Sequence, residues 1–145
     1  MEVALALLAD AANATETKKL NVLGIFSNIN PPLLPYRHPS MTLVLKFEVD
    51  PVEADTDKTI QVVLVDPDGR ELNRLEIQAR LPKPENAGAP MELLLNLGMN
   101  GVFLERAGPH AFVILVNGET KKRVPLNVTA PRVIAEDNRL EDNHD

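Results

Sequence analysis

Apolar residues of this chain gather in short runs that recur roughly every ten to fifteen residues, with turn-forming residues between them. This spacing is typical of an all-β sandwich or barrel. The first run is rich in alanine and also suits a helix, and we assign it to a strand because residues 10–17 then form the loop before the next one. The predicted strands span residues 3–10, 20–30, 41–50, 59–66, 71–80, 91–97, 110–117 and 120–129.

Side chains in several of these segments alternate between apolar and polar, as they do in strands that bury one face. In segment 71–80, Leu75 and Ile77 alternate with charged and amide side chains, which predicts a half-buried strand. In segment 59–66 both alternating sets are largely apolar, which is expected of a central strand. Pro125 cannot donate a ladder hydrogen bond, so the last strand is predicted to lie at an edge or to contain a bulge.

Turn chemistry fixes several connections. Asp66-Pro67-Asp68-Gly69 fits a type I turn that closes a hairpin. Asn117-Gly118 is the favoured type I′ dipeptide and predicts the final hairpin. The loop 82–90 holds three prolines and is interpreted as a crossover between two sheets. If consecutive strands run antiparallel, loops 31–40, 67–69 and 98–109 gather at one end of the domain.

The stretch Ala107-Gly108-Pro109-His110-Ala111-Phe112 and the apolar strand after it resemble the late F–G hairpin of immunoglobulin-like domains. In that resemblance His110 stands where such domains place a tyrosine, and Phe112 stands at the next core position. The resemblance implies an immunoglobulin-like β-sandwich of about eight strands. Segments 41–50 and 59–66 would be its B and C strands, preceded by an extra N-terminal hairpin.

A closer resemblance covers nearly the whole body of the chain. The sequences Leu5-Ala6-Leu7-Leu8-Ala9-Asp10-Ala11-Ala12 and Lys19-Leu20-Asn21-Val22-Leu23-Gly24-Ile25-Phe26 resemble a family of small bacterial proteins that form a domain of unknown function. The resemblance implies a stand-alone cytoplasmic sandwich and brings no known activity. The acidic stretch after Pro131 lies outside it.

Length and composition suit one β-sandwich domain over residues 1–130, followed by an acidic C-terminal tail over residues 131–145. The chain contains no cysteine, which excludes disulfides, thiol catalysis and cysteine-ligated zinc. Its net charge of −6 and its aromatic content of 3% argue against binding to nucleic acid, which needs basic patches and stacking platforms. The short apolar N-terminal run lacks a basic flank, so we expect neither a signal peptide nor a membrane segment.

Metal or small-ligand binding is the alternative function that the sequence leaves open. His38 and His110 are predicted at the same loop end, with Asp66, Asp68 and Glu105 as possible neighbours. Two histidines and a carboxylate suit a transition metal, and the acidic loops suit calcium. Neither set has a ligand spacing of a known motif. The simpler interpretation is that neither histidine binds a metal: one lies in a loop, and the other lies at a strand end and donates a hydrogen bond to the backbone.

Enzyme activity has no support in the motifs. The chain has no Gly-x-Ser-x-Gly motif and no phosphate-cradling loop. A hydrolase is therefore the least favoured of the three functions considered, and no cofactor is expected.

The preferred function is that of a non-enzymatic interaction or structural subunit, which binds a protein partner or itself. Four prolines stiffen the loop 30–39, and stiff loops lose little entropy on binding. The predicted contact residues in this loop and in the tail are Leu33, Leu34, Tyr36, Arg37, His38, Val133, Ile134 and Leu140. A sheet edge is the third predicted contact surface. Alternatively, Leu33, Leu34 and Tyr36 turn inward and plug the open end of the sandwich.

Overall fold

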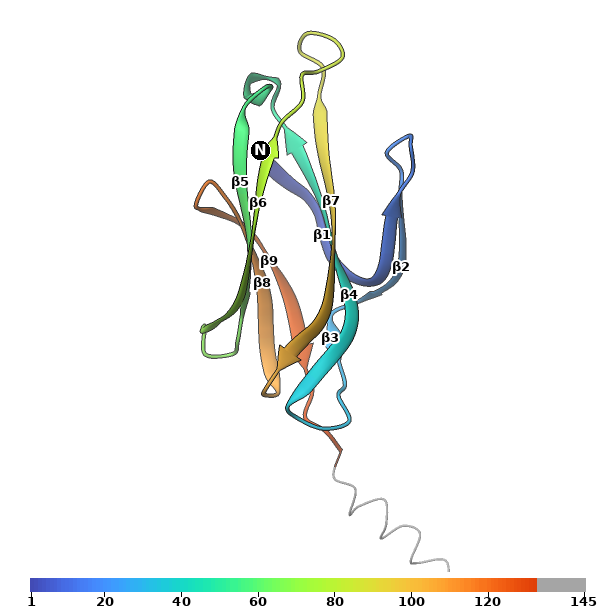
Figure 1. Cartoon of the computed structure of the whole chain (residues 1–145), viewed down its shortest axis with the longest axis vertical. Coiled ribbons are helices and arrows are strands. Elements are labelled where there is room, and N and C mark those ends of the chain that lie inside the picture. Colours follow the sequence, from blue (N-terminus) through green and yellow to red (C-terminus); the bar gives the residue numbers. More distant parts are fainter. Residues whose placement is uncertain (133–145) are drawn as a thin grey trace, which may run out of the picture.

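The structure, a computed structural model, describes residues 1–132, which form nine strands in two sheets packed face to face (Figure 1). Four strands form sheet A in the order β2-β1-β4-β7, and five form sheet B in the order β3-β9-β8-β5-β6. A short 3₁₀ helix spans Pro51–Glu53. The strands are β1 (Glu2–Ala14), β2 (Leu20–Phe26), β3 (Asn28–Ile29), β4 (Tyr36–Val49), β5 (Asp57–Val65), β6 (Glu71–Arg80), β7 (Met91–Leu104), β8 (Gly108–Val116) and β9 (Glu119–Val128).

The strand order identifies the sandwich as immunoglobulin-like. β1, β4 and β7 take the places of strands A, B and E, and β9, β8, β5 and β6 take those of G, F, C and C′. The predicted fold class is therefore confirmed, including the F–G hairpin, which is β8–β9. β2 is the predicted addition, because it forms an extra N-terminal hairpin with β1. Within residues 1–132, no helix is long and apolar enough to cross a membrane.

The core fills the space between the two inner sheet faces, and the alternation in the sequence decides which side chains reach it. On β4, Leu43, Leu45 and Phe47 are fully buried, and Ile60 on β5 and Ile114 on β8 meet them from sheet B. Nearly all of this core is aliphatic. Burying one such side chain contributes about 1.5–3 kcal/mol, so the sandwich depends on many well-packed aliphatic residues rather than on a few large rings.

The predicted turns are confirmed by their geometry. The Gly69 N–H donates to the Asp66 carbonyl at 2.9 Å, and Gly69 has a φ of +81°, as the predicted turn requires. Asn117 and Gly118 both have positive φ, which is the signature of a type I′ turn. The loop after β6 crosses from sheet B to sheet A, as predicted.

Three strands are longer than the sequence pattern predicted. β1 continues to Ala14, β4 begins at Tyr36 instead of residue 41, and β7 continues to Leu104 instead of residue 97. The loop predictions for residues 11–14, 36–40 and 98–104 are therefore wrong. β4 and β7 extend together because each supplies the other's hydrogen-bond partners, as in the pair Tyr36 and Leu104. The predicted strand 20–30 is divided in the structure at Ser27 into β2 and β3.

Gly24 lies near the middle of β2. Gly24 has a φ of +71°, which L-residues rarely adopt. A Cβ at this position would also overlap the carboxylate of Asp10 on the neighbouring strand. Both constraints require glycine here.

We predict that Gly24→Ala lowers the free energy of unfolding by about 1–2 kcal/mol for the φ strain alone, and by more through the overlap with Asp10. Urea denaturation followed by circular dichroism measures this cost. Gly69→Ala is the control, because Gly69 also has a positive φ but a Cβ there would meet no atom within 4 Å. Adding Asp10→Ala to Gly24→Ala removes the overlapping carboxylate. The cost of Gly24→Ala in unfolding free energy should then come closer to the cost of Gly69→Ala. Equal costs for the two single variants would contradict the overlap.

Candidate functional site: the groove between β6 and β7

Two outer strands flank a groove on one side of the sandwich. β6 is the last strand of sheet B and β7 is the last strand of sheet A. A groove of about 670 Å³ lies between them. In the described part of the chain, neither strand has a hydrogen-bonded neighbour on its outer side. The groove is therefore bordered by two rows of backbone donors and acceptors that could pair with an added strand.

The floor of the groove consists of core side chains. Val62 and Leu64 on β5, Phe112 on β8 and Val102 on β7 all line it. They belong to the main hydrophobic core of the sandwich. The groove is thus a lateral opening into the space between the two sheets, and an apolar group that entered it would contact the core directly.

Leu75 shows most clearly that the sandwich is open here. It continues the inward-facing set of Ile77 and Ala79, which pack against the core. Leu75 is nevertheless 43% exposed. Leu72 and Phe103 also line the groove, and they are 39% and 40% exposed. Three large apolar side chains at one opening are more than the scattered exposed residues that a soluble surface usually carries.

Arginines give the groove a polar rim. The guanidinium of Arg37 lies 4.8 Å from the centre of the Phe103 ring, and its Nη1 donates to the Gly101 carbonyl at 3.1 Å. Arg74 pairs with Glu71 at 2.6 Å, and this hydrogen bond lowers the pKa of the Glu71 carboxyl. Within residues 1–132, Arg37 forms no ion pair. The groove therefore combines an apolar floor with a charged and polar rim.

The predicted contact residues of the proline-rich loop divide between the two alternatives that the sequence left open. Leu33 is 62% exposed, as a contact residue would be. Leu34 and Tyr36 pack against the core and plug the end of the sandwich. Arg37 and His38 lie in β4 and not in the loop, and only Arg37 reaches the groove. The tail residues Val133, Ile134 and Leu140 lie outside the described residues.

The two histidines of the alternative metal site lie in different sheets. His38 on β4 sits between the rings of Phe26 and Tyr36, at centroid distances of 6.0 and 5.9 Å. His110 on β8 is buried, and its Nδ1 lies 3.0 Å from the Gly108 carbonyl. In residues 1–132, no three side chains of the metal-ligating types gather closely enough to hold an ion. The predicted set of two histidines and a carboxylate is not assembled.

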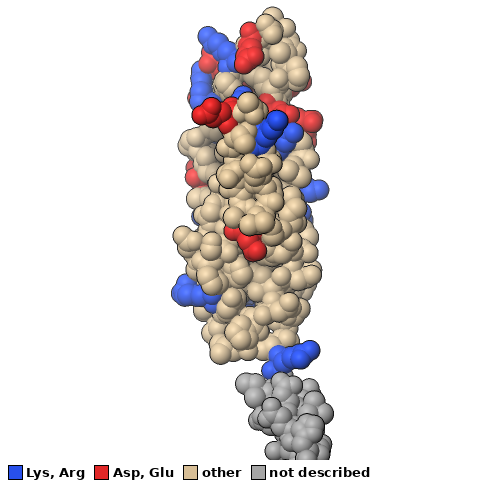
Figure 2. Space-filling view, turned by 90° about the vertical axis from the view of Figure 1, so that its right-hand side faces the viewer, with Lys and Arg blue, Asp and Glu red and all other residues tan. Residues whose placement is uncertain are grey.

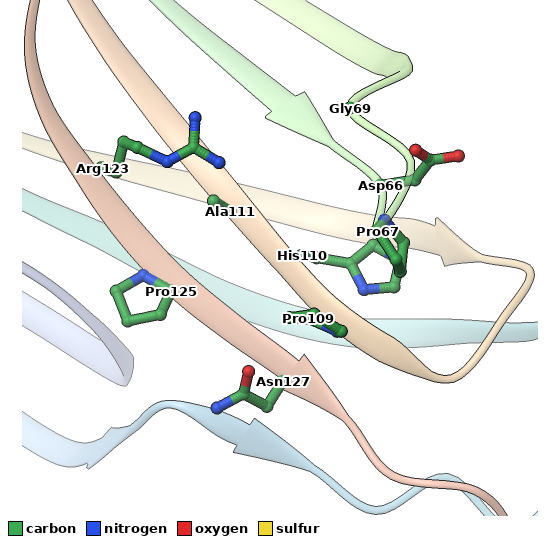
Figure 3. Close-up of a pocket in the computed structure, with 9 residues that line it drawn as sticks. All are labelled: Asp66, Pro67, Gly69, Pro109, His110, Ala111, Arg123, Pro125 and Asn127. Carbon is green, nitrogen blue, oxygen red and sulfur yellow. The ribbon is translucent and has the colours of Figure 1, made fainter.

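A shallow pocket of about 370 Å³ lies beside His110 and Asp66. Its geometry shows why the Asp66 carboxylate does not form a metal site with His110. The His110 ring lies beside Pro67, while the Asp66 carboxylate points away from it (Figure 3). Asp66 Oδ1 accepts hydrogen bonds from the backbone N–H groups of Asp68 and Arg70 at 2.9 and 2.8 Å. Asp66 Oδ2 lies 3.4 Å from Nη2 of Arg106. The carboxylate therefore holds the turn and links it to the loop before β8.

Sequence reasoning missed most of the groove. Phe103 was assigned to the loop 98–109. The inward positions of β7 shift by one residue at Gly101, after which Val102 and Leu104 are buried. Leu75 was predicted to be buried, and its segment gives no sign that the facing strand leaves it uncovered. Of the predicted contact residues that the structure describes, only Arg37 lines the groove.

A family of unknown function, DUF6941, has a model that matches residues 4–129. The chain belongs to this family. The resemblance seen in the sequence is thereby confirmed. Membership brings no activity or partner, because the function of the family is unknown. Comparison with curated proteins gives no match.

Two solved structures are similar to this member of the family. One is an immunoglobulin-like protein from Pseudomonas aeruginosa, with 15% identity and a TM-score of 0.36, and the match covers 87% of this chain and 98% of the other. The other is the alkylpurine DNA glycosylase AlkC of Pseudomonas fluorescens, bound to DNA containing an abasic site analog, with 17% identity and a TM-score of 0.45. That match covers 72% of this chain but only 28% of the glycosylase. At these scores neither likeness says anything about activity.

We predict that Asp66→Asn destabilises the protein at neutral pH and that this difference shrinks in acid. Burial disfavours the charged Asp66, but backbone hydrogen bonds and Arg106 outweigh it and lower the pKa of its carboxyl. Asparagine keeps the acceptor and removes the charge. Because the folded-state pKa is lowered, the stabilisation is present above about pH 3.9 and is lost as the pH falls below that value. Urea midpoints of both proteins from pH 7 to pH 2 test this, and a constant difference would contradict it.

Proposed function

We propose that this chain is a non-enzymatic protein-interaction subunit whose β6–β7 groove binds an extended segment of a protein partner. The observation that carries the proposal is Leu75, an inward-facing side chain that is 43% exposed between two outer strands. Filling the groove would remove Leu72, Leu75 and Phe103 from water. Burying such side chains contributes about 1.5–3 kcal/mol each.

Strand addition is the binding mode that best fits the groove. The outer edges of β6 and β7 supply main-chain donors and acceptors, which give affinity to any extended peptide. Specificity would come from alternate side chains of the peptide, since every second one would point to the floor formed by Val62, Leu64 and Phe112. Arg37 and Arg70 on the rim favour carboxylates beside those apolar positions.

The groove also suits a partner better than it suits catalysis. Among the described residues that line it there is no histidine, serine or cysteine. Its two carboxylates are Glu71, which is paired with Arg74, and Glu105. A reaction that needs a nucleophile and a matched base has no pair of groups here to supply them.

A photocrosslinking amino acid at position 75, in the full chain expressed in cells, tests the proposal. We expect it to capture one segment of a partner, whereas the same amino acid at position 52 should not. Val52 is the matched control because it is 82% exposed and does not line the groove. The captured segment should be extended, with alternating apolar residues.

A synthetic peptide of the captured segment provides the decisive measurement. Calorimetry should show that Leu75→Asp weakens its binding to the purified protein at least about tenfold, which corresponds to ~1.4 kcal/mol. Val52→Asp should leave the affinity unchanged. Capture from both positions alike, or a peptide affinity insensitive to Leu75→Asp, would overturn the proposal. Circular dichroism of each variant checks that it is folded.

A further inference from the structure

The N-terminal hairpin continues beyond the sandwich as a two-stranded arm. We define the β1–β2 arm as residues 9–26, which comprise the second part of β1, the connecting turn and β2. β1 pairs with β4 at residues 2–9 and with β2 at residues 8–14, so only two strands support each other beyond residue 9. The arm stands apart from the rest of sheet A (Figure 1). A two-stranded ribbon is only marginally stable in water.

The surface of the arm is unusually apolar for a projecting element. Leu23 is 72% exposed and Ile25 is 65% exposed. Apart from Asp10, the two strands of the arm carry no charged residue. On the face of the molecule seen in Figure 2, charged side chains gather toward one end and the surface below them is largely uncharged. Exposed apolar surface of this kind marks an interaction site.

In the described part of the chain, the outer edge of β2 lacks the protection that both edges of sheet B have. Proteins protect edge strands from pairing by charges, proline or short length. At the edges of sheet B, β6 carries four charged residues and β3 has only two residues. β7, the other edge of sheet A, carries one charged residue and borders the groove already described. β2 has seven residues, none of them charged or proline, so it has none of these protections.

We propose that β2 pairs antiparallel with β2 of a second copy of this chain, across a two-fold axis. Identical strands that pair antiparallel are self-complementary, because each then offers the other the same donors and acceptors. Since β2 is uncharged, the two copies can approach there although each chain has a net charge of −6. Leu23 and Ile25 would gain cross-strand apolar neighbours, and the two arms would form a four-stranded ribbon.

The self-complementarity of two antiparallel β2 strands favours a second copy over an unrelated partner, and the position of β2 in sheet A leaves room for it. β2 and β7 are the opposite ends of sheet A, so a dimer through β2 leaves the β6–β7 groove accessible. The inference therefore does not rest on the proposed function of the groove. Either one can fail without the other.

Sedimentation equilibrium of the full chain tests the dimer. We expect a dimer at micromolar concentrations, and we expect Leu23→Lys and Ile25→Lys each to raise its dissociation constant at least about tenfold, because each places like charges across the axis. Val52→Lys is the matched control, since it adds the same charge to an exposed aliphatic residue outside both proposed surfaces, and it should leave the dimer intact. A wild-type monomer over this range, or a dimer insensitive to both β2 substitutions, overturns the inference.

Single cysteines give a direct test, because the chain has none of its own. Under mild oxidation, a series of single substitutions to cysteine along β2 should form disulfide-linked dimers. The yield should be highest at the residue nearest the two-fold axis and fall on either side, since a disulfide needs Cα atoms about 4.4–6.8 Å apart. Val52→Cys, outside both proposed surfaces, should not cross-link. A yield as high at position 52 as along β2, or one that is uniform along β2, contradicts the antiparallel pairing.

Discussion

β4 holds the sandwich together. It pairs with β7 along nearly all of its fourteen residues and with β1 over residues 42–48. Its inward side chains Met41, Leu43, Leu45 and Phe47 are fully buried. Without β4, sheet A would separate into a hairpin and a lone strand, and the core would lose its central apolar strand on that side. Because aromatic residues are few, this continuous aliphatic face has to supply most of the stabilisation.

The unequal widths of the two sheets explain where the molecule is open. Sheet A ends at β7, while sheet B continues through β5 to β6. The inner face of β6 is covered by sheet A at Ile77 and Ala79, but it is uncovered at Leu75. The groove is therefore a consequence of how two sheets of unequal width overlap, and its floor consists of core side chains.

The two proposed surfaces lie at opposite ends of sheet A and depend on different interactions. At the groove, apolar core atoms are accessible and the backbone edges on both sides are fixed in place. At the β1–β2 arm, a strand without charges or prolines projects from the domain, and what it lacks is a neighbour to pair with in the described chain. A module that joins its own copy through one edge and a partner through another could assemble larger complexes without any catalytic group.

The sequence determined the strands, their approximate centres and the turns between them, because the alternation of side chains and the backbone demands of Asp66–Gly69 and Asn117–Gly118 are local properties. It also indicated the sandwich and its extra hairpin. The ends of β1, β4 and β7 were decided only in the tertiary structure, because a strand continues through glycine, alanine or proline where a neighbour supplies hydrogen bonds. The tertiary structure also decided which apolar side chains are exposed. Leu75 and Ile77 have the same pattern in the sequence, and they differ only because sheet A covers one and leaves the other open.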